Sequence, residues 1–229
     1  TSNIFMRIIK IKEVCNTEQL DSIYALMEKI EFQNGDETAS GLAKAAKKNA
    51  EAVPAGEHYQ ELVFFIQNIL KNNSYLQTRL VPKFFSSPLI NYYKAGDRYG
   101  RHYDISHMQD GETSIRKDYS FTLMLSKAEA YSGGDLEIEI NHQKHRVQLN
   151  AGDMVVYTSN YIHSVLPISH GERLAYIGWI SSHVKNPLAL EVLNAYEDLH
   201  VALKKYDISD DDKLSIGYVK NKLQHLISD

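Results

Sequence analysis

The chain has 229 residues, of which 43% are hydrophobic and 24% are charged, values typical of a folded globular protein. This composition excludes a disordered chain and a collagen-like fibre, and the single cysteine, Cys15, excludes an intrachain disulfide and a multi-cysteine zinc site. The formal charge of −4 comes without a dense basic cluster, so we expect no nucleic-acid partner. No apolar run approaches the about 20 residues that span a bilayer, and the segment TSNIFMRIIK lacks the apolar run of a secretory signal. We therefore expect no membrane partner and a cytoplasmic location.

The first third of the chain favours helices. Residues 16–19 (NTEQ) form a helix-capping pattern, and apolar residues between positions 20 and 30 recur at helical spacing. Residues 32–41 (FQNGDETASG) are rich in turn formers. High helix propensity predicts a helix over residues 43–52, and a one-sided apolar pattern predicts another over residues 59–70.

From about residue 81 the pattern changes to that of short strands. Runs rich in β-branched and aromatic residues alternate with turn clusters that contain Gly, Asn, Asp or Ser. The expected strands cover residues 88–93, 119–125, 135–140, 145–149, 154–157, 163–168 and 174–180. This spacing predicts a sandwich or jelly roll and not a parallel sheet. After Pro187 the helical spacing returns, so the β core is bracketed by helices.

The most informative residues lie in the segment YGRHYD. Side chains at positions i and i+2 of a strand point the same way, so His102 and Asp104 can present an imidazole and a carboxylate to one point. His163, on a later strand, offers a second imidazole. Two histidines and one carboxylate make the facial triad of non-haem Fe(II) oxygenases. Arg173, ten residues after His163, could hold a carboxylate in a two-point contact.

Each of these residues also has an ordinary structural explanation. A single His-x-Asp pattern is common, His163 alone fits a strand-end histidine, and Arg173 alone fits a surface ion pair. The set is stronger than its members because spacing, strand context and chain order agree. Among the other histidines, His107 is the alternative metal ligand, whereas His142 and His145 fit a solvated hairpin.

Three segments resemble a known enzyme family: YYKAGDRYGRHYD, DYSFTLMLSKAEAYSGGDLEI and LNAGDMVVYTSNYIHSVLPISHGERLAYIGWI. They resemble the Fe(II)- and 2-oxoglutarate-dependent dioxygenases of the prolyl 4-hydroxylase type, and most closely the bacterial and phage PKHD-type hydroxylases. The upstream segment NGDETASGLAKAAKKNAEA is similar to a further block of that family, so the resemblance weakens only after Pro187. It implies a single α+β domain over residues 1–229, mainly β. Residues 1–80 would form a helical support region, 81–182 a double-stranded β-helix (jelly roll), and 183–229 the C-terminal helices.

The resemblance also implies roles for individual residues. His102, Asp104 and His163 would hold Fe(II), and Arg173 would bind the distal carboxylate of 2-oxoglutarate. Tyr93, on the strand that leads to the metal, matches a tyrosine that helps to bind this cosubstrate.

Other positions around the expected site have less specific roles. Gly133 and Gly134 fit a turn in which backbones approach closely or φ is positive. Trp179 matches a position near the pocket, and an inward tryptophan fits the core equally well. Residues 105–118 form a long polar segment beside the metal and are expected to be a substrate lid or specificity loop, with His107 and Arg116 as its candidate residues. A solvated hairpin without a role is the alternative for this segment.

The resemblance implies hydroxylation of an unidentified substrate with consumption of O2 and conversion of 2-oxoglutarate to succinate and CO2. The substrate would be a prolyl or lysyl residue of a protein, a free amino acid or a small metabolite, and ascorbate is a further candidate cofactor. Asp104 argues against halogenation, because a halide would need the coordination position that this carboxylate fills. The alternatives are a non-catalytic jelly-roll protein that binds metal and 2-oxoglutarate, and a zinc hydrolase, in which Arg173 would have no evident role.

Overall fold

The computed structural model describes residues 8–35, 47–110 and 112–227. The helices are α1 (Thr17–Met27), α3 (Glu57–Asn72), α4 (Ser74–Leu80), α5 (Pro187–Leu203) and α6 (Asp210–Ile227), with a short 3-10 helix η2 (Ala128–Ala130). The strands are β1 (Ile8–Ile11), β2 (Phe32–Asn34), β3 (Lys47–Lys48), β4 (Ala50–Ala52), β5 (Pro82–Phe85), β6 (Leu89–Lys94), β7 (Arg98–His102), β8 (His107–Asp110), β9 (Thr113–Arg116), β10 (Tyr119–Met124), β11 (Tyr131–Gly133), β12 (Leu136–Ile140), β13 (Gln143–Val147), β14 (Met154–Thr158), β15 (Ile162–Val165) and β16 (Ile168–Ser182).

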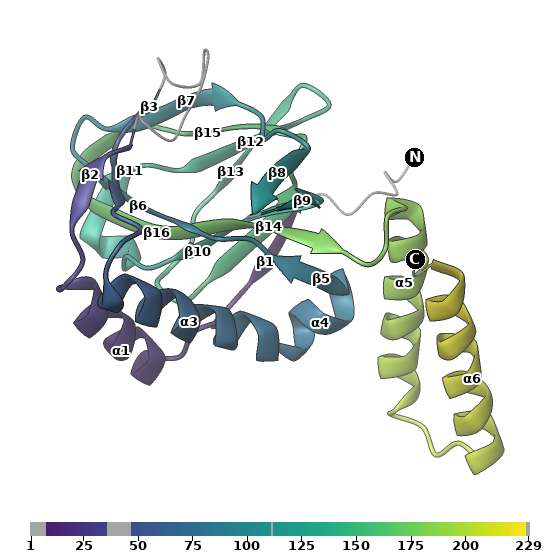
Figure 1. The fold of residues 1–229 in the computed structure, drawn as a ribbon. Helices are drawn as coiled ribbons and strands as arrows, with labels where there is room; N and C mark the ends of the chain where they lie inside the picture. The colour runs from purple at the N-terminus through teal and green to yellow at the C-terminus, as the bar shows by residue number, and fades with distance from the viewer. Residues whose placement is uncertain (1–7, 36–46, 111, 228–229) are drawn as a thin grey trace.

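Two antiparallel sheets form the core of the molecule (Figure 1). The larger one runs in the order β1-β14-β10-β16-β6-β4-β2, and β5 and β11 also pair with β16. The smaller one runs β13-β12-β15-β7-β3. Crossovers between strands far apart in the chain are typical of a double-stranded β-helix. The predicted α+β class, mainly β, is confirmed.

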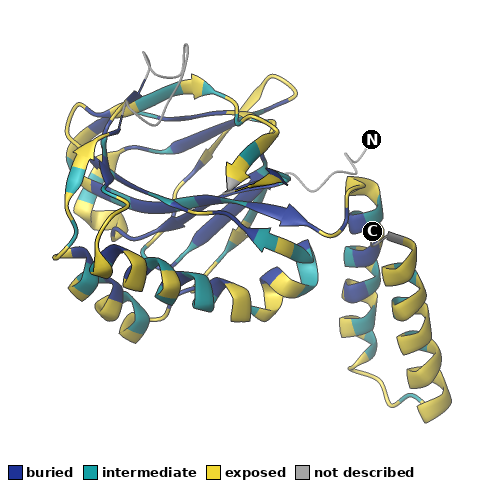
Figure 2. Ribbon diagram, in the orientation of Figure 1, coloured by how far each residue is buried: buried dark blue, intermediate teal, exposed yellow. Residues whose placement is uncertain are grey.

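Alternation along the strands assigns one face of the larger sheet to the helices and the other to the space between the sheets. In β10, Phe121 and Leu123 pack with the helices in one apolar cluster, whereas Met124 belongs to a second cluster between the sheets. The helices α1 and α3 lie across the larger sheet in Figure 1, and the central strands are buried in Figure 2. Because both faces of β10 are covered, all its residues are buried.

Two predicted helices are found where the sequence places them. Helix α1 begins after Asn16, whose side chain accepts from the backbone N–H of Gln19, while the Gln19 side chain accepts from the Asn16 N–H. This is the predicted capping box. Helix α3 contains the predicted residues 59–70 and buries Leu62, Ile66 and Leu70.

The predicted helix over residues 43–52 is wrong for the residues that the structure describes. Residues 43–46 lie outside them, and residues 47–52 contribute strands β3 and β4. Strand β3 pairs with β7, and β4 lies between β2 and β6. A buried ion pair between Lys47 and Glu51, each with a side chain 2% exposed, holds the two short strands together. Helix propensity amounts to less than about 1 kcal/mol per residue, so strand pairing and burial override it here.

Residues 32–34, expected in a turn-rich segment, form strand β2 instead.

At the other end of the chain, α5 and α6 form a hairpin that projects from the sheets (Figure 1). It is tied to α4 by Arg79, which donates to the backbone carbonyl of Asn194 and pairs with Asp198. No helix within the described residues is long and apolar enough to cross a membrane.

Candidate metal centre and cosubstrate pocket

Strand register brings the two predicted histidines together. His102 ends β7, His163 lies in β15, and the two residues are paired partners in the smaller sheet. Their ring centroids are 4.2 Å apart. Asp104 follows two residues after His102, and one ligand atom from each of the three residues lies within 4.8 Å of the others. Two imidazoles and one carboxylate at this separation can hold one metal ion and leave open coordination positions.

Backbone contacts select the metal-binding nitrogen of each histidine. The Nδ1 atom of His102 lies 2.8 Å from the carbonyl oxygen of Gly100, and the Nδ1 atom of His163 lies 2.9 Å from that of Tyr161. Each carbonyl therefore fixes Nδ1 as the protonated donor and leaves Nε2 free for a metal. Burial, and next the neighbouring His163, lower the pKa of His102 to about 4. The ring is thus neutral near pH 7, which is the form that binds a metal.

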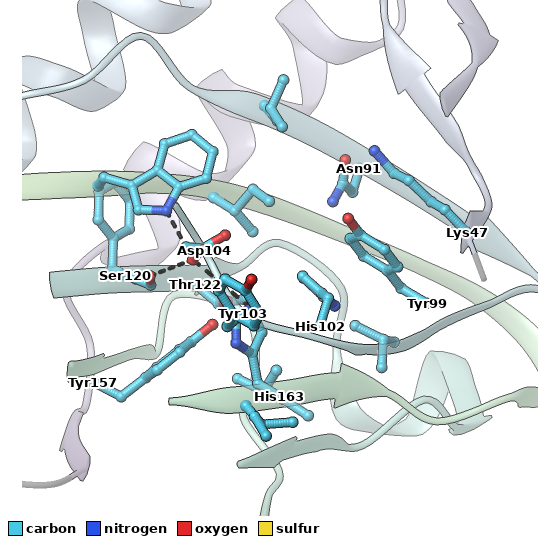
Figure 3. Close-up of a pocket in the computed structure, with 18 of the residues that line it drawn as sticks. Lys47, Asn91, Tyr99, His102, Tyr103, Asp104, Ser120, Thr122, Tyr157 and His163 are labelled. Atoms are coloured by element: carbon cyan, nitrogen blue, oxygen red, sulfur yellow. Dashed lines mark hydrogen bonds and ion pairs between the residues drawn. The ribbon is translucent and has the colours of Figure 1, made fainter. Parts of the chain in front are cut away.

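Two donors orient the carboxylate of Asp104. The Ser120 hydroxyl donates to Oδ2 at 2.5 Å, and the indole N–H of Trp179 donates to the same oxygen at 2.8 Å (Figure 3). Within the described part of the chain, Oδ1 accepts no such bond and is left for a metal. The sequence left Trp179 between a pocket position and a core position, and it proves to line the cavity and to contact the Asp104 carboxylate.

We expect Ser120→Ala to lower metal affinity by about 10-fold, because outer hydrogen bonds to a metal-ligating carboxylate fix its orientation. Trp179 would still hold Oδ2, so binding should weaken and not vanish. Titration with Zn(II) followed by calorimetry measures the effect. Ser159→Ala is the matched control, since Ser159 is equally buried and its hydroxyl has no partner among the described residues. Equal affinities of the two variants would contradict this role of Ser120.

The three residues face a cavity of about 660 Å³ between the two sheets. At its outer end Tyr103 and Ile105 are 67% and 64% exposed. At its inner end Arg173 is 2% exposed and Tyr93 1% exposed. Both sheets contribute side chains to the lining, which includes Asn91, Tyr93, Tyr99, Ser120, Thr122, Tyr157, Ile177 and Trp179. The cavity therefore runs from an open rim, past His102, Asp104 and His163, to a buried cation.

Arg173 is a buried cation that lacks an acidic partner. Its Nε atom has no hydrogen-bond partner in the described structure, and none of the ion pairs found there includes it. Burying a charge without a counter-ion is costly, so the site is suited to an anion from outside the chain. The far carboxylate of 2-oxoglutarate fits this requirement, because guanidinium groups bind carboxylates with two parallel hydrogen bonds.

Tyr93 lies directly beside this cation. It pairs with Arg173 across β6 and β16, and the guanidinium carbon is 5.4 Å from the Tyr93 ring centroid. Burial raises the pKa of the Tyr93 phenol, although the charge of Arg173 opposes that shift. The phenol stays neutral and can donate a hydrogen bond to an anion at this end of the cavity.

The predicted turn at Gly133 and Gly134 has the positive φ angles that were expected. Gly133 and Gly134 have φ values of +76° and +67°. A Cβ atom on Gly134 would lie 2.1 Å from Cδ1 of Ile168 and 3.1 Å from Cδ of Arg173. The turn thus packs against the stem of the arginine and fixes its position.

Gly134→Ala is therefore expected to weaken 2-oxoglutarate binding several-fold by displacing Arg173. It should also lower the free energy of unfolding by roughly 1–2 kcal/mol through left-handed backbone strain. Gly56→Ala is the control, because Gly56 also has a positive φ (+96°) but its Cβ would meet nothing within 4 Å. Urea denaturation and 2-oxoglutarate titration should show instability in both variants and weaker cosubstrate binding only in Gly134→Ala. Unchanged 2-oxoglutarate binding in Gly134→Ala would contradict the claim that this turn fixes the position of Arg173.

Of the predicted lid segment, Ile105 and Lys117 line the cavity, whereas the two candidate residues His107 and Arg116 do not. Strands β8 and β9 pair as a hairpin, in which His107 is exposed and its Nδ1 atom contacts the hydroxyl of Ser106 at 3.0 Å. Arg116 forms a two-point ion pair with Asp118 and donates to the carbonyl of Ser182. His107 is not part of the group of metal-binding atoms found in the described residues.

Several cavity residues were missed from the sequence. Ser120 and Thr122 are the clearest, since they are polar residues at i and i+2 in a fully buried strand. That pattern is a usable signal of a polar inner face. Tyr99, whose ring stacks on His102 at a centroid distance of 3.7 Å, carries no comparable signal. His142 and His145 lie on the predicted β12–β13 hairpin and are exposed.

Known proteins share this architecture and these segments. The family model described as the 2OG-Fe(II) oxygenase superfamily matches residues 88–181. A PKHD-type hydroxylase of Hyphomonas neptunium is 30% identical over 223 residues, which cover 97% of this chain and 100% of that protein.

Two solved structures are similar in fold. A prolyl-4-hydroxylase of Pseudomonas putida has a TM-score of 0.53 at 20% identity, with 76% of this chain and 92% of that chain covered. A prolyl hydroxylase of Trichoplax adhaerens, solved with a peptide fragment of the hypoxia inducible factor oxygen degradation domain, has a TM-score of 0.57 at 16% identity. That superposition covers 76% of this chain and 83% of the other.

The fold likeness supports the double-stranded β-helix, and the relative aligned over its whole length supports the family. A group of two histidines and one aspartate able to hold a metal is present in the cavity. The resemblance noted in the sequence is thereby confirmed. The chain belongs to the PKHD-type hydroxylases of the 2OG-Fe(II) oxygenase superfamily and is an Fe(II)- and 2-oxoglutarate-dependent hydroxylase.

Proposed function

We propose that His102, Asp104 and His163 are the Fe(II) ligands and that Arg173, assisted by Tyr93, binds the distal carboxylate of 2-oxoglutarate. One observation carries this proposal: the three ligand atoms, within 4.8 Å of one another, share a cavity with a buried arginine that has no acidic partner among the described residues. Fe(II) with 2-oxoglutarate and O2 supplies the chemistry that inserts one oxygen atom into a substrate C–H bond.

The residues of the chain would contribute binding, orientation and exclusion of water. Arg173 fixes the far end of the cosubstrate, so that its keto acid end reaches the metal ligands from the inner part of the cavity. The carbonyls of Gly100 and Tyr161 hold both imidazoles in one tautomer. The buried position of the inner cavity, where Tyr93 and Tyr157 are 1% and 4% exposed, would limit the access of water to the reaction.

The decisive experiment is anaerobic addition of Fe(II) and 2-oxoglutarate to the purified protein. A weak visible charge-transfer band should appear only when both are present, because the band requires the keto acid to chelate the bound metal. Admission of O2 should then release succinate and CO2. If the band is absent, or if it forms with Fe(II) alone, the proposed arrangement of ligands and cosubstrate is wrong.

The substrate enters, in this proposal, from the open rim of the cavity, and it is an amino acid, a peptide segment or another small molecule with an accessible C–H bond. Two finer expectations from the sequence belong to the proposal. Ascorbate would act as a reductant that keeps the iron ferrous, which is tested by counting turnovers with and without it. A cytoplasmic location is tested by cell fractionation.

We also propose that residues 105–118 close over the rim as a lid. Arg116 would serve as the anchor of the β8–β9 hairpin through Asp118 and Ser182, while His107 stays on the moving part. Closure would exclude water at little cost, since few apolar contacts hold a hairpin of this kind. Amide hydrogen exchange in β8 and β9 should slow when Zn(II) and 2-oxoglutarate are added. Unchanged exchange would remove the lid role.

A further inference from the structure

Charge balance inside the cavity points to a second anion-binding position. Besides the two histidines, the charged side chains of the described residues that line the cavity are Lys47, Arg101, Asp104, Lys117 and Arg173. Four of these are cations and one is an acid, and that acid is the proposed metal ligand. The cavity therefore carries an excess of positive charge that the chain must balance or leave for a bound molecule.

Two of the four cations are balanced by the protein itself. Lys47 is paired with the buried Glu51, and Arg101 is paired with Glu139 at 2.5 Å. Arg173 is assigned above to 2-oxoglutarate. Lys117 is left, since no acidic side chain of the described residues forms an ion pair with it.

Lys117 is held close to the metal ligands through one aromatic ring. Its Nζ atom lies 3.6 Å from the ring centroid of Trp179, whose indole N–H donates to Asp104 at 2.8 Å. The backbone N–H of Lys117 donates to the carbonyl of Ser106 at 2.8 Å, which fixes the base of the side chain. A single small molecule could therefore bind this ammonium through an anionic group and still reach the proposed metal site.

The surroundings of Lys117 favour a counter-ion. Partial burial lowers the pKa of its ammonium, and the charge of Asp104 opposes that shift. The contact with the Trp179 ring compensates only part of the lost hydration, because a cation–π contact is worth about 0.5–2 kcal/mol. A carboxylate would satisfy the hydrogen-bonding capacity of the ammonium that an aromatic face leaves unused.

The other residues at the rim indicate the chemical character of the rest of the bound molecule. Tyr103, Ile105 and Ile162 line the outer cavity and expose 67%, 64% and 36% of their surface. They offer apolar contact in the cavity that Lys117 also lines. A molecule that fits both features has an apolar body and one negatively charged group.

We propose that Lys117 is a specificity-determining residue that binds a carboxylate of the substrate, so that the hydroxylated substrate is an anion with an apolar body. This inference rests on the proposed function of the same site. The carboxylate could belong to a free amino acid or small acid, or to an acidic side chain in a peptide, and the experiment separates these sources.

The chain provides its own reporter for the test. Trp179 is the single tryptophan of the sequence and lies under the Lys117 ammonium, so a carboxylate bound there should change its fluorescence. The protein, loaded with Zn(II) and 2-oxoglutarate, is titrated with N-acetyl amino acids and with their matched amides. A second arm uses end-blocked tripeptides in which a central proline, leucine or lysine is followed by Glu or by Gln.

At least one acid is expected to bind about 10-fold more tightly than its amide, which is the size of a charge-assisted hydrogen bond. Lys117→Met should abolish this preference, Lys117→Arg should keep most of it, and Arg101→Gln, which alters a paired cation, should leave it intact. Preference in the first arm identifies a free acid, and preference in the second identifies an acidic peptide.

Equal binding of every acid and its amide by the wild-type protein would overturn the inference, as would an acid preference that survives in Lys117→Met. Failure of the proposed function has a separate signature, because the anaerobic charge-transfer band of wild-type protein with Fe(II) and 2-oxoglutarate would then be missing. A normal band with no acid preference would refute the role of Lys117 alone.

Discussion

Replacement of His163 by alanine is expected to abolish the iron-dependent conversion of 2-oxoglutarate to succinate while the protein stays folded. The variant removes one of three ligand atoms that lie within 4.8 Å of one another, and two remaining ligands hold Fe(II) too weakly for turnover. Within the described residues, the hydrogen bond of the His163 side chain goes to the backbone carbonyl of Tyr161, two residues away, so little of the fold depends on it. Succinate formation and calorimetric Fe(II) binding measure the effect, and the thermal unfolding transition verifies the fold.

Two other histidines supply the controls for this prediction. His145→Ala alters an exposed histidine of the β12–β13 hairpin and should leave activity unchanged. His107→Ala tests the alternative ligand considered from the sequence, whose imidazole contacts Ser106 and is not part of the His102–Asp104–His163 group. Near-normal succinate formation by His163→Ala would refute the ligand assignment, and loss of activity in His107→Ala would direct the search to the β8–β9 hairpin.

The parts of the fold that could be predicted are those where local pattern and tertiary position agree. Strands β10, β12, β14 and β16 combine high β propensity with clear turn signals, so their existence follows from the sequence. The two-residue period of a strand predicts the grouping of His102 with Asp104. The two residues do come together, although β7 ends at His102 and Asp104 lies beyond the strand. Their meeting with His163 depends on strand register, which the sequence alone does not specify but the family resemblance implies.

The parts that could not be predicted depend on long-range pairing. Residues 47–52 have the composition of a helix, yet they become strands because β6 and β7 offer free edges and because Lys47 and Glu51 neutralise each other when buried. The same limit applies around the metal site. The contact of Trp179 with Asp104 joins residues 75 positions apart, so no local pattern reveals it.

The charged side chains in and beside the β8–β9 hairpin differ in whether the chain pairs them or leaves them facing the cavity. Residues 105–118 contain acidic and basic side chains, namely Asp110, Glu112, Arg116, Lys117 and Asp118. Asp118 neutralises the charge of Arg116, whereas Lys117 lines the cavity of the proposed metal site. Selectivity therefore depends on which charges the chain neutralises internally and not on the net charge of the segment.

Arg173→Met is expected to weaken 2-oxoglutarate binding by about 100-fold, because a two-point contact between guanidinium and carboxylate is worth a few kcal/mol in a buried site. Metal affinity should change little, since none of the hydrogen bonds to His102, Asp104 or His163 involves Arg173. The fold should also tolerate the change. Methionine fills a similar volume without a charge, and replacement of an unpartnered buried charge by an apolar side chain is often neutral or stabilising.

Titration of Zn(II)-loaded protein with 2-oxoglutarate, next to titration of the apo protein with Zn(II), separates the two affinities. Arg101→Met is the matched control, because Arg101 lines the same cavity but is exposed and paired with Glu139. Arg173→Lys should fall between wild type and Arg173→Met, since lysine keeps the charge and loses the two-point geometry. A parallel fall of Zn(II) and 2-oxoglutarate affinity in Arg173→Met would show that Arg173 supports the structure of the metal site. The inner end of the cavity would then have to bind the cosubstrate through Tyr93 and its neighbours alone.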